Sequence, residues 1–215
     1  TMEIKKVKFN ILVVTFYVLC AWADEQQAAH DGSKLFAEGQ EKAQALSKKL
    51  ARRNLSLEKG DQLPVKLQED VDEVVDLFTQ AADAGFAEAQ HALGGMYNMG
   101  YMVKEKDDSL SAKYFSLAAD QGKLESITNL GTMYKDGVGV EHDIIQAIDL
   151  YEKAFEGGHS LAAYNLAAIH ANGVGGLPKD LGRARTLLAA IPDFQGASEA
   201  MAQIDKMIQQ EAGEL

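Results

Sequence analysis

Histidine is the residue type in this sequence that could serve most chemical roles, because its imidazole binds zinc and exchanges protons near neutral pH. Five histidines are present, at His30, His91, His142, His159 and His170. No two of them are three or four residues apart, the spacing that puts two ligands on one face of a helix. His159 and His170, eleven residues apart, fall at opposite ends of one predicted helix. We therefore expect no metal site, and histidines that lie at the surface or pack between helices.

Two glycine-rich turns, YKDGVGVEHD and HANGVGGLPKD, have a composition that phosphate-binding loops share. Neither contains G-x-x-x-x-G-K-[ST] or G-x-G-x-x-G, and no predicted strand precedes either turn. The first turn also lacks the alternating Asp and Asn ligands of a calcium loop. The serines are scattered, and none stands in a G-x-S-x-G elbow. The sequence therefore predicts no enzyme active site, no small-molecule substrate and no cofactor.

The overall charge of the chain limits which classes of molecule it can bind. The chain carries a formal net charge of -11, and binding to a phosphate backbone needs clustered lysine and arginine instead. The same negative field weakens adhesion to anionic lipid headgroups. We expect no nucleic acid, and we favour basic or neutral protein partners.

The N-terminus has the organisation of a secretory signal peptide. Lys5, Lys6 and Lys8 precede a largely apolar run that ends at Trp22, and Ala21-Trp22-Ala23 fits a cleavage site after Ala23. The apolar run is shorter than a membrane-spanning helix needs, so an uncleaved membrane anchor is the alternative. Cys20, the only cysteine, lies inside this segment. A mature chain would therefore contain no disulfide. The signal peptide predicts that the mature chain is periplasmic or secreted.

The middle of the sequence repeats itself with a period of 36 or 37 residues. Leu93, Leu130 and Leu166 are 37 and 36 residues apart. The same intervals relate five further columns of matched residues: Gly85, Gly122 and Gly158; Gly94, Gly131 and Ala167; Tyr97, Tyr134 and His170; Gly100, Gly137 and Gly173; and Asp107, Asp143 and Asp180, with small shifts. A period of this length predicts stacked supersecondary units.

Each period reads as two helices. Ala89, Leu93 and Tyr97 form one apolar stripe on a first helix. Asp143 precedes a second helix as an N-cap, and Asp107 and Asp180 are equivalent to it in the other repeats.

The small residues of the repeats have two predicted roles. Gly137 and Gly173 are placed to end first helices in a left-handed conformation. Gly94, Gly131 and Ala167 mark points where two helices cross closely. The predicted repeat core is Leu93, Tyr97, Leu130, Tyr134 and Leu166.

These columns resemble the Sel-one-like repeat (SLR), a relative of the tetratricopeptide repeat. The resemblance rests on AQHALGGMYNMG with FSLAADQG, and on SITNLGTMYKDGVGVEHDIIQA, and it covers roughly Asp70 to Gly196. It implies an all-α fold, an α/α superhelical solenoid of antiparallel helix pairs, and a scaffolding role. Some cysteine-rich relatives are associated with β-lactam hydrolysis or binding. They depend on paired cysteines in each repeat, which this chain lacks.

The ends depart from the repeat pattern. Residues 70–85 match only a second helix, and the helical stretch 34–54, with Lys48, Lys49, Arg52 and Arg53 near its end, is its expected partner. The predicted organisation is 1–23 signal peptide, 24–85 helical region with a degenerate capping repeat, 86–122, 123–158 and 159–196 repeats, the last with a degenerate second helix, and 197–215 C-terminal capping helix.

In stacked helix pairs the first helices line the concave surface, which is the expected docking groove. Counting from the leucine column selects Glu88, His91, Asn98, Thr128, Thr132, Lys135, Tyr164 and Asn172. A generic solvated face is the alternative reading of this patch.

The expected function is an exported, bacterial adaptor that holds an envelope protein or a host protein in its groove. A periplasmic regulator of a membrane sensor is the second hypothesis, and a β-lactam-interacting hydrolase is the third.

Overall fold

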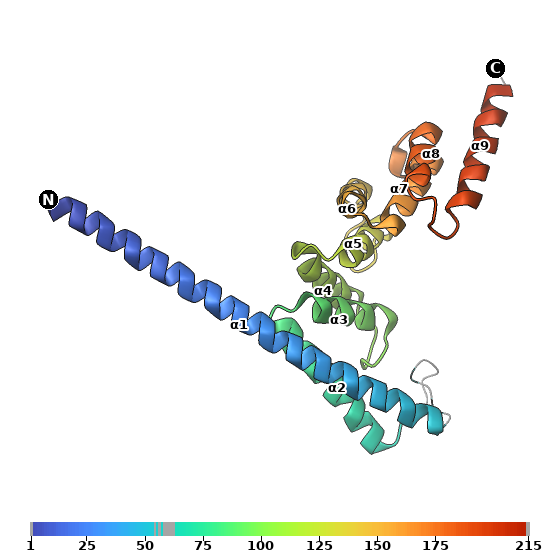
Figure 1. Ribbon diagram of the computed structural model, residues 1–215. Coiled ribbons are helices and arrows are strands. Elements are labelled where there is room, and N and C mark those ends of the chain that lie inside the picture. Colours follow the sequence, from blue (N-terminus) through green and yellow to red (C-terminus); the bar gives the residue numbers. More distant parts are fainter. Residues whose placement is uncertain (1, 54, 56, 58–62, 214–215) are drawn as a thin grey trace. The chain divides into compact units, whose positions relative to one another are not determined.

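The computed structural model describes residues 2–53, 55, 57 and 63–213, and it describes side chains from Gln26 onward. Over these residues every regular element is a helix (Figure 1). The elements are α1 (Met2–Arg52), α2 (Val65–Asp83), α3 (Ala87–Met99), α4 (Asp108–Asp120), α5 (Leu124–Asp136), α6 (Ile144–Glu156), α7 (Ser160–Asn172), the 3-10 turn η1 (Val174–Gly176), α8 (Leu181–Ala189) and α9 (Ala197–Gly213). The predicted all-α class is confirmed.

The helices form two compact units. The N-terminal unit comprises Thr1–Leu93 with Tyr101–Lys104, and the C-terminal unit comprises Gly94–Gly100 with Glu105–Leu215. Over the described residues, no helix combines the length with the unbroken apolar character that crossing a bilayer requires. The predicted signal segment, residues 1–23, falls in the part of the chain whose side chains are not described.

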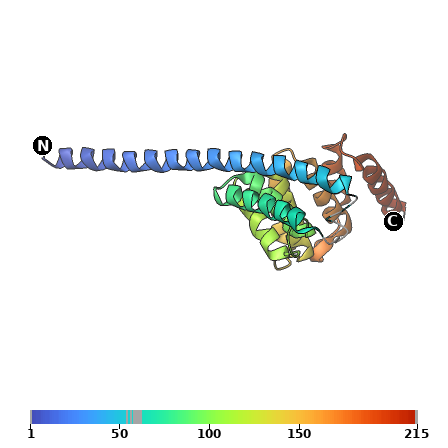
Figure 2. The ribbon, with the colours of Figure 1, turned by 90° about the horizontal axis from the view of Figure 1, so that it is seen from below.

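In the N-terminal unit α2 lies along the C-terminal half of α1 (Figure 2). Leu46 and Leu50 of α1 pack with Leu67 and Val71 of α2 in one buried cluster. Further along, a Cβ atom at Gly39 would lie 2.6 Å from the Phe78 ring. Glycine at that position is therefore what allows the two helices to approach closely.

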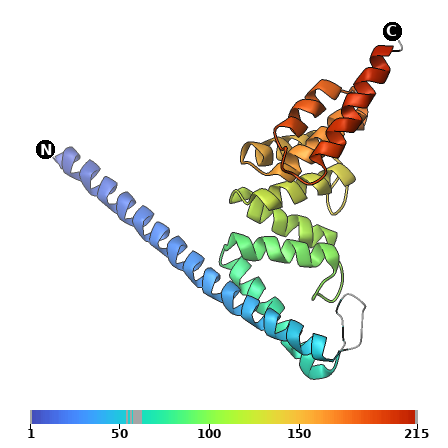
Figure 3. The same cartoon turned by 45° about the vertical axis from the view of Figure 1, so that its right-hand side comes forward.

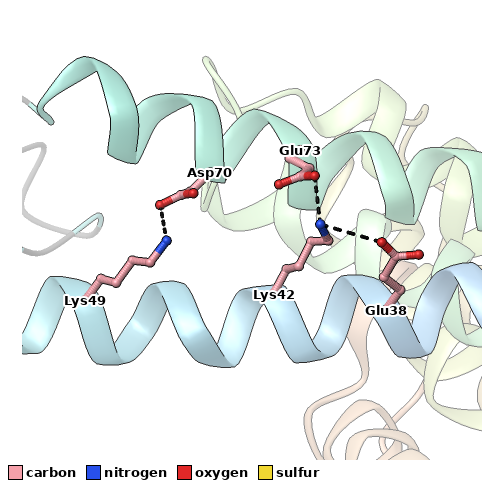
Figure 4. Close-up of polar contacts among 5 residues, drawn as sticks. All are labelled: Glu38, Lys42, Lys49, Asp70 and Glu73. Carbon is pink, nitrogen blue, oxygen red and sulfur yellow. Dashed lines mark hydrogen bonds and ion pairs between the residues drawn. The ribbon is translucent and has the colours of Figure 1, made fainter.

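Ion pairs along the exposed edge of the α1–α2 contact join the same two helices (Figure 4). Lys42 Nζ lies 2.7 Å from Glu73 and 3.6 Å from Glu38, and Lys49 Nζ lies 2.6 Å from Asp70. The hydrogen bond to Glu73 is the main reason that the pKa of Lys42 is raised above its ordinary value. These pairs are largely exposed to solvent, so they add little stability.

In the C-terminal unit each helix from α4 to α9 packs against the next one along the chain (Figure 3). Their apolar faces share one core, which contains Leu130, Leu166 and the fully buried Tyr151. The leucine column is buried throughout, because Leu93, Leu130 and Leu166 are 0%, 7% and 0% exposed. Tyr97 and Tyr134 are half-buried.

The predicted helix boundaries rest on local chemistry and are confirmed. The carboxylate of Asp107 accepts from Leu110 N at 2.9 Å, Asp143 accepts from Ile145 N and Gln146 N at 3.0 Å, and Asp180 accepts from Arg183 N at 2.7 Å. Gly137 and Gly173 end α5 and α7 with φ of 66° and 68°. A side chain with a Cβ atom is strained in that region, so glycine is favoured there.

Candidate protein-docking site

Over the described side chains, no group of three or more His, Cys, Asp or Glu residues is placed to hold a metal ion. The histidines lie apart, and His159 is used structurally, because its Nδ1 lies 2.7 Å from Thr128 Oγ1. Thr128 Oγ1 already donates its proton to Leu124 O at 3.0 Å. The contact between Thr128 and His159 joins α5 to the residue that precedes α7.

One Ser-x-x-Lys spacing does occur, from Ser56 to Lys59. This spacing serves acylation in serine β-lactamases only together with further motifs. Both residues lie outside the described residues, and the spacing adds nothing to the candidate site.

The C-terminal unit contains a cavity of about 170 Å³ between α7, α8 and α9. Its walls are mainly apolar, and amide groups from Asn172 and Gln203 supply most of its hydrogen-bonding capacity. The lining residues are Tyr164, Ala167, Ala168, Ala171, Asn172, Leu188, Ala200, Gln203, Ile204 and Met207. A cavity of this kind accepts an apolar side chain together with a nearby backbone amide.

Two predicted docking residues, Tyr164 and Asn172, meet at this α7–α9 cavity. The Tyr164 ring is held against Phe194, with 5.3 Å between ring centroids. Asn172 is exposed, and its Nδ2 donates to Ala168 O at 2.8 Å. The α7 face selected from the leucine spacing therefore does form one wall of a cavity.

Sequence reasoning missed the opposite wall, which α9 supplies through Ala200, Gln203 and Met207. The sequence assigned residues 197–215 to a capping helix only. The signal was present in the helical spacing of Ala200, Ile204 and Met207, but the direction in which this stripe faces depends on how α9 docks on α8.

The expectation for Thr128 needs correction, because its side chain is 1% exposed. The two hydrogen bonds described above consume its hydroxyl, so it is not available to a partner. Thr132 is half-buried and its hydroxyl donates to Thr128 O at 3.2 Å. The Thr132 hydroxyl also lies 2.9 Å from the Tyr151 hydroxyl, within hydrogen-bond distance. Lys135 forms an ion pair with the adjacent Asp136.

Burial raises the pKa of the Tyr151 phenol above its ordinary value, and the hydrogen bond with Thr132 acts in the opposite direction. A phenol that resists ionisation stays a hydrogen-bond donor at any physiological pH. Tyr151 is thus a structural polar group within the core.

The remaining predicted docking residues lie on α3. Glu88 is exposed, whereas His91 and Asn98 are half-buried. Glu88 and His91 belong to the N-terminal unit and Asn98 to the C-terminal unit.

The Sel1 repeat profile matches residues 87–123, 124–159 and 160–189. The matched segments cover just under half of the chain. They coincide with the helix pairs α3 with α4, α5 with α6, and α7 with α8. Sel1 repeats generally act as protein-interaction scaffolds, because stacked helix pairs present extended surfaces.

Two known proteins are similar to part of this chain. The chain is 36% identical over 97 residues to DAP3-binding cell death enhancer 1 of Rattus norvegicus, which is 44% of this chain and 18% of that protein. It is 31% identical over 102 residues to cytochrome c oxidase assembly factor 7 of Mus musculus, which is 45% of this chain and 44% of that protein. The chain therefore spans less than half the length of either relative.

A solved structure supports the fold. The crystal structure of a protective antigen from uropathogenic Escherichia coli strains, which displays an SLR fold, superposes with a TM-score of 0.55 and 28% sequence identity. The match covers 61% of this chain and 28% of that chain.

Proposed function

We propose that this protein is an exported adaptor that binds a protein partner through the α7–α9 cavity. The observation that carries the proposal is the composition of that cavity. Apolar atoms from three helices surround a space of about 170 Å³, and Asn172 and Gln203 place amides among them. This combination suits one apolar anchor side chain of a partner and the polar backbone on either side of it.

The chemistry of the lining residues favours a peptide segment over a small metabolite. No charged side chain lines the cavity, so it offers nothing to orient a phosphate or carboxylate metabolite. Alanines at positions 167, 168 and 171 of α7 leave room for a partner backbone to approach the helix. An extended or helical partner segment with a leucine, methionine or phenylalanine anchor fits these features.

Export is proposed from the N-terminal segment, in which lysines precede an apolar run and an A-x-A site. The partner is then a protein of the cell envelope or of a host. N-terminal sequencing of the protein recovered from a cell fractionation tests this directly. Export predicts a mature chain that begins at Asp24, and a chain that keeps residues 1–23 in the cytoplasm contradicts it.

The docking proposal is tested by filling the cavity. Ala168 is exposed and lines the cavity, so Ala168→Trp places an indole where the anchor side chain would bind. Ala202 on α9 is also exposed but does not line the cavity, which makes Ala202→Trp a matched control. Affinity purification from native cells should lose the partner with Ala168→Trp and retain it with Ala202→Trp. Equal recovery with both variants would rule out this docking site.

A further inference from the structure

The N-terminal unit contains a second cavity, of about 350 Å³, at the end of α1. Its lining residues are Lys49, Arg52, Arg53, Lys66, Leu67 and Asp70. Four of these side chains are cationic and one is a carboxylate, so the local formal charge is +3 in a chain whose net charge is -11. Among the described lining residues Leu67 is the only apolar one, so this basic cavity differs in kind from the α7–α9 cavity.

The described residues neutralise only part of this positive charge. Lys49 is paired with Asp70 at 2.6 Å (Figure 4). Among the described residues, Arg52, Arg53 and Lys66 form no ion pair. Within the described part of the chain, two arginines and one lysine are therefore left to pair with an anion from another molecule.

Helix dipoles explain only part of the cluster. Lys49 and Arg52 occupy the last turn of α1, where a cation stabilises a helix. Lys66 is the second residue of α2, where a cation is unfavourable. Pro64 at the N-cap makes no side-chain cap, and the first turn of α2 contains no acidic residue. Lys66 therefore adds positive charge to the N-terminal end of the α2 dipole, and no described carboxylate in the first turn offsets it. Stabilisation of the helix does not explain a lysine at this position.

We propose that the basic cavity binds an acidic peptide segment of a protein partner. Arginine guanidinium groups pair with carboxylates through two parallel hydrogen bonds, and two adjacent arginines with one lysine match a segment with two or three carboxylates. This site lies in the N-terminal unit, uses other residues and takes a ligand of opposite polarity to the α7–α9 cavity. It is therefore independent of the docking function proposed above.

An acidic peptide fits better than a more extended polyanion. A nucleic acid or an anionic bilayer would bring many phosphates toward a chain with a net charge of -11, and most of those contacts would be repulsive. A short segment places its charges only within the basic cavity. The screening length of about 8 Å in physiological salt confines the attraction to that region.

The test measures binding of a fluorescein-labelled hexaglutamate peptide to the full chain by anisotropy at low ionic strength. The double substitution Arg52→Gln and Arg53→Gln should weaken binding about tenfold or more, since it removes two charge-assisted contacts. Lys66→Gln should weaken it to a smaller extent. Lys48→Gln is the matched control, because Lys48 is an exposed neighbour that does not line the cavity, and it should change affinity less than about twofold.

Two further arms decide the class of ligand. Binding of hexaglutamate should fall as salt rises, and a hexaglutamine peptide should not bind. Equal affinity of the unchanged protein and the Arg52/Arg53 double variant would overturn the proposal. It would also be overturned if the unchanged protein bound phosphatidylserine vesicles or a single-stranded oligonucleotide through these arginines while hexaglutamate failed to compete. Circular dichroism of each variant separates lost binding from lost folding.

Discussion

An alanine Cβ atom at Gly94 would lie 2.6 Å from the ring of Phe115. Phe115 belongs to α4, the second helix of the first repeat, and Ser111 on the same helix donates from its hydroxyl to Gly94 O at 2.8 Å. The absence of a side chain at Gly94 therefore sets how closely α3 and α4 cross. Gly131 and Tyr151 repeat the relationship in the second repeat, where the Cβ atom would lie 3.0 Å from the ring.

Gly94→Ala should destabilise the protein by about 1–3 kcal/mol relative to Gly95→Ala, because it overpacks a close helix crossing. Gly95 stands next to it on α3, and a Cβ atom there would meet nothing closer than Met99 Cε at 4.0 Å. Gly95→Ala should be neutral or stabilising by up to about 1 kcal/mol, since alanine favours helix. Urea unfolding of both variants measures the difference, and equal stabilities would show that the α3–α4 crossing is not limited by this contact.

Leu166→Ala should cost about 2–5 kcal/mol, because it leaves a cavity in the core of the C-terminal unit. Leu161 on the same helix is 39% exposed, whereas Leu166 is fully buried. Leu161→Ala should therefore cost much less. Thermal unfolding of the pair provides the comparison, and similar losses would place Leu166 outside the shared core.

Asp143→Ala should cost about 1 kcal/mol, because two backbone N–H groups at the start of α6 lose their acceptor. Asp143→Asn keeps an acceptor oxygen at the N-cap and should cost only a few tenths of a kcal/mol. Urea denaturation midpoints measure both. An alanine variant as stable as the asparagine variant would mean that the cap does not contribute.

The stability of the protein should fall above about pH 10 partly through Tyr151. Its folded pKa is raised by burial, so above the unfolded pKa the unfolded chain releases this proton while the folded chain retains it. The contribution of Tyr151 is therefore fully present below the unfolded pKa and is lost as pH rises toward the folded value. Tyr151→Phe should show a shallower loss of melting temperature between pH 9 and 11 than the unchanged protein. Identical slopes would indicate that the phenol ionises equally in both states.

The features that the sequence predicts well are those decided within a few residues. The N-caps at Asp107, Asp143 and Asp180 and the left-handed Gly137 and Gly173 depend on backbone groups two to four residues away. The same caps and turns recur with the period of the leucine column, so the helix pairs and their order along the chain could be derived from the sequence alone.

Features that depend on packing between distant residues were not predictable in the same way. The spacing placed Thr128 on the partner face, but its hydroxyl meets His159, 31 residues further along the chain. The wall that α9 adds to the α7–α9 cavity likewise depends on how α9 docks. Lys66 and Arg52 line one cavity only because α1 and α2 pack together. No periodic pattern reports those contacts.

The most direct test of the proposed docking site is site-specific photocrosslinking in native cells. A photoreactive phenylalanine analogue replaces Asn172, which lines the α7–α9 cavity, or Ala202, which is exposed and does not line it. The proposal predicts a discrete protein adduct from position 172, removed by Ala168→Trp in the same chain, and none from position 202. Adducts of equal yield at both positions, or no adduct at position 172, would contradict docking at this cavity.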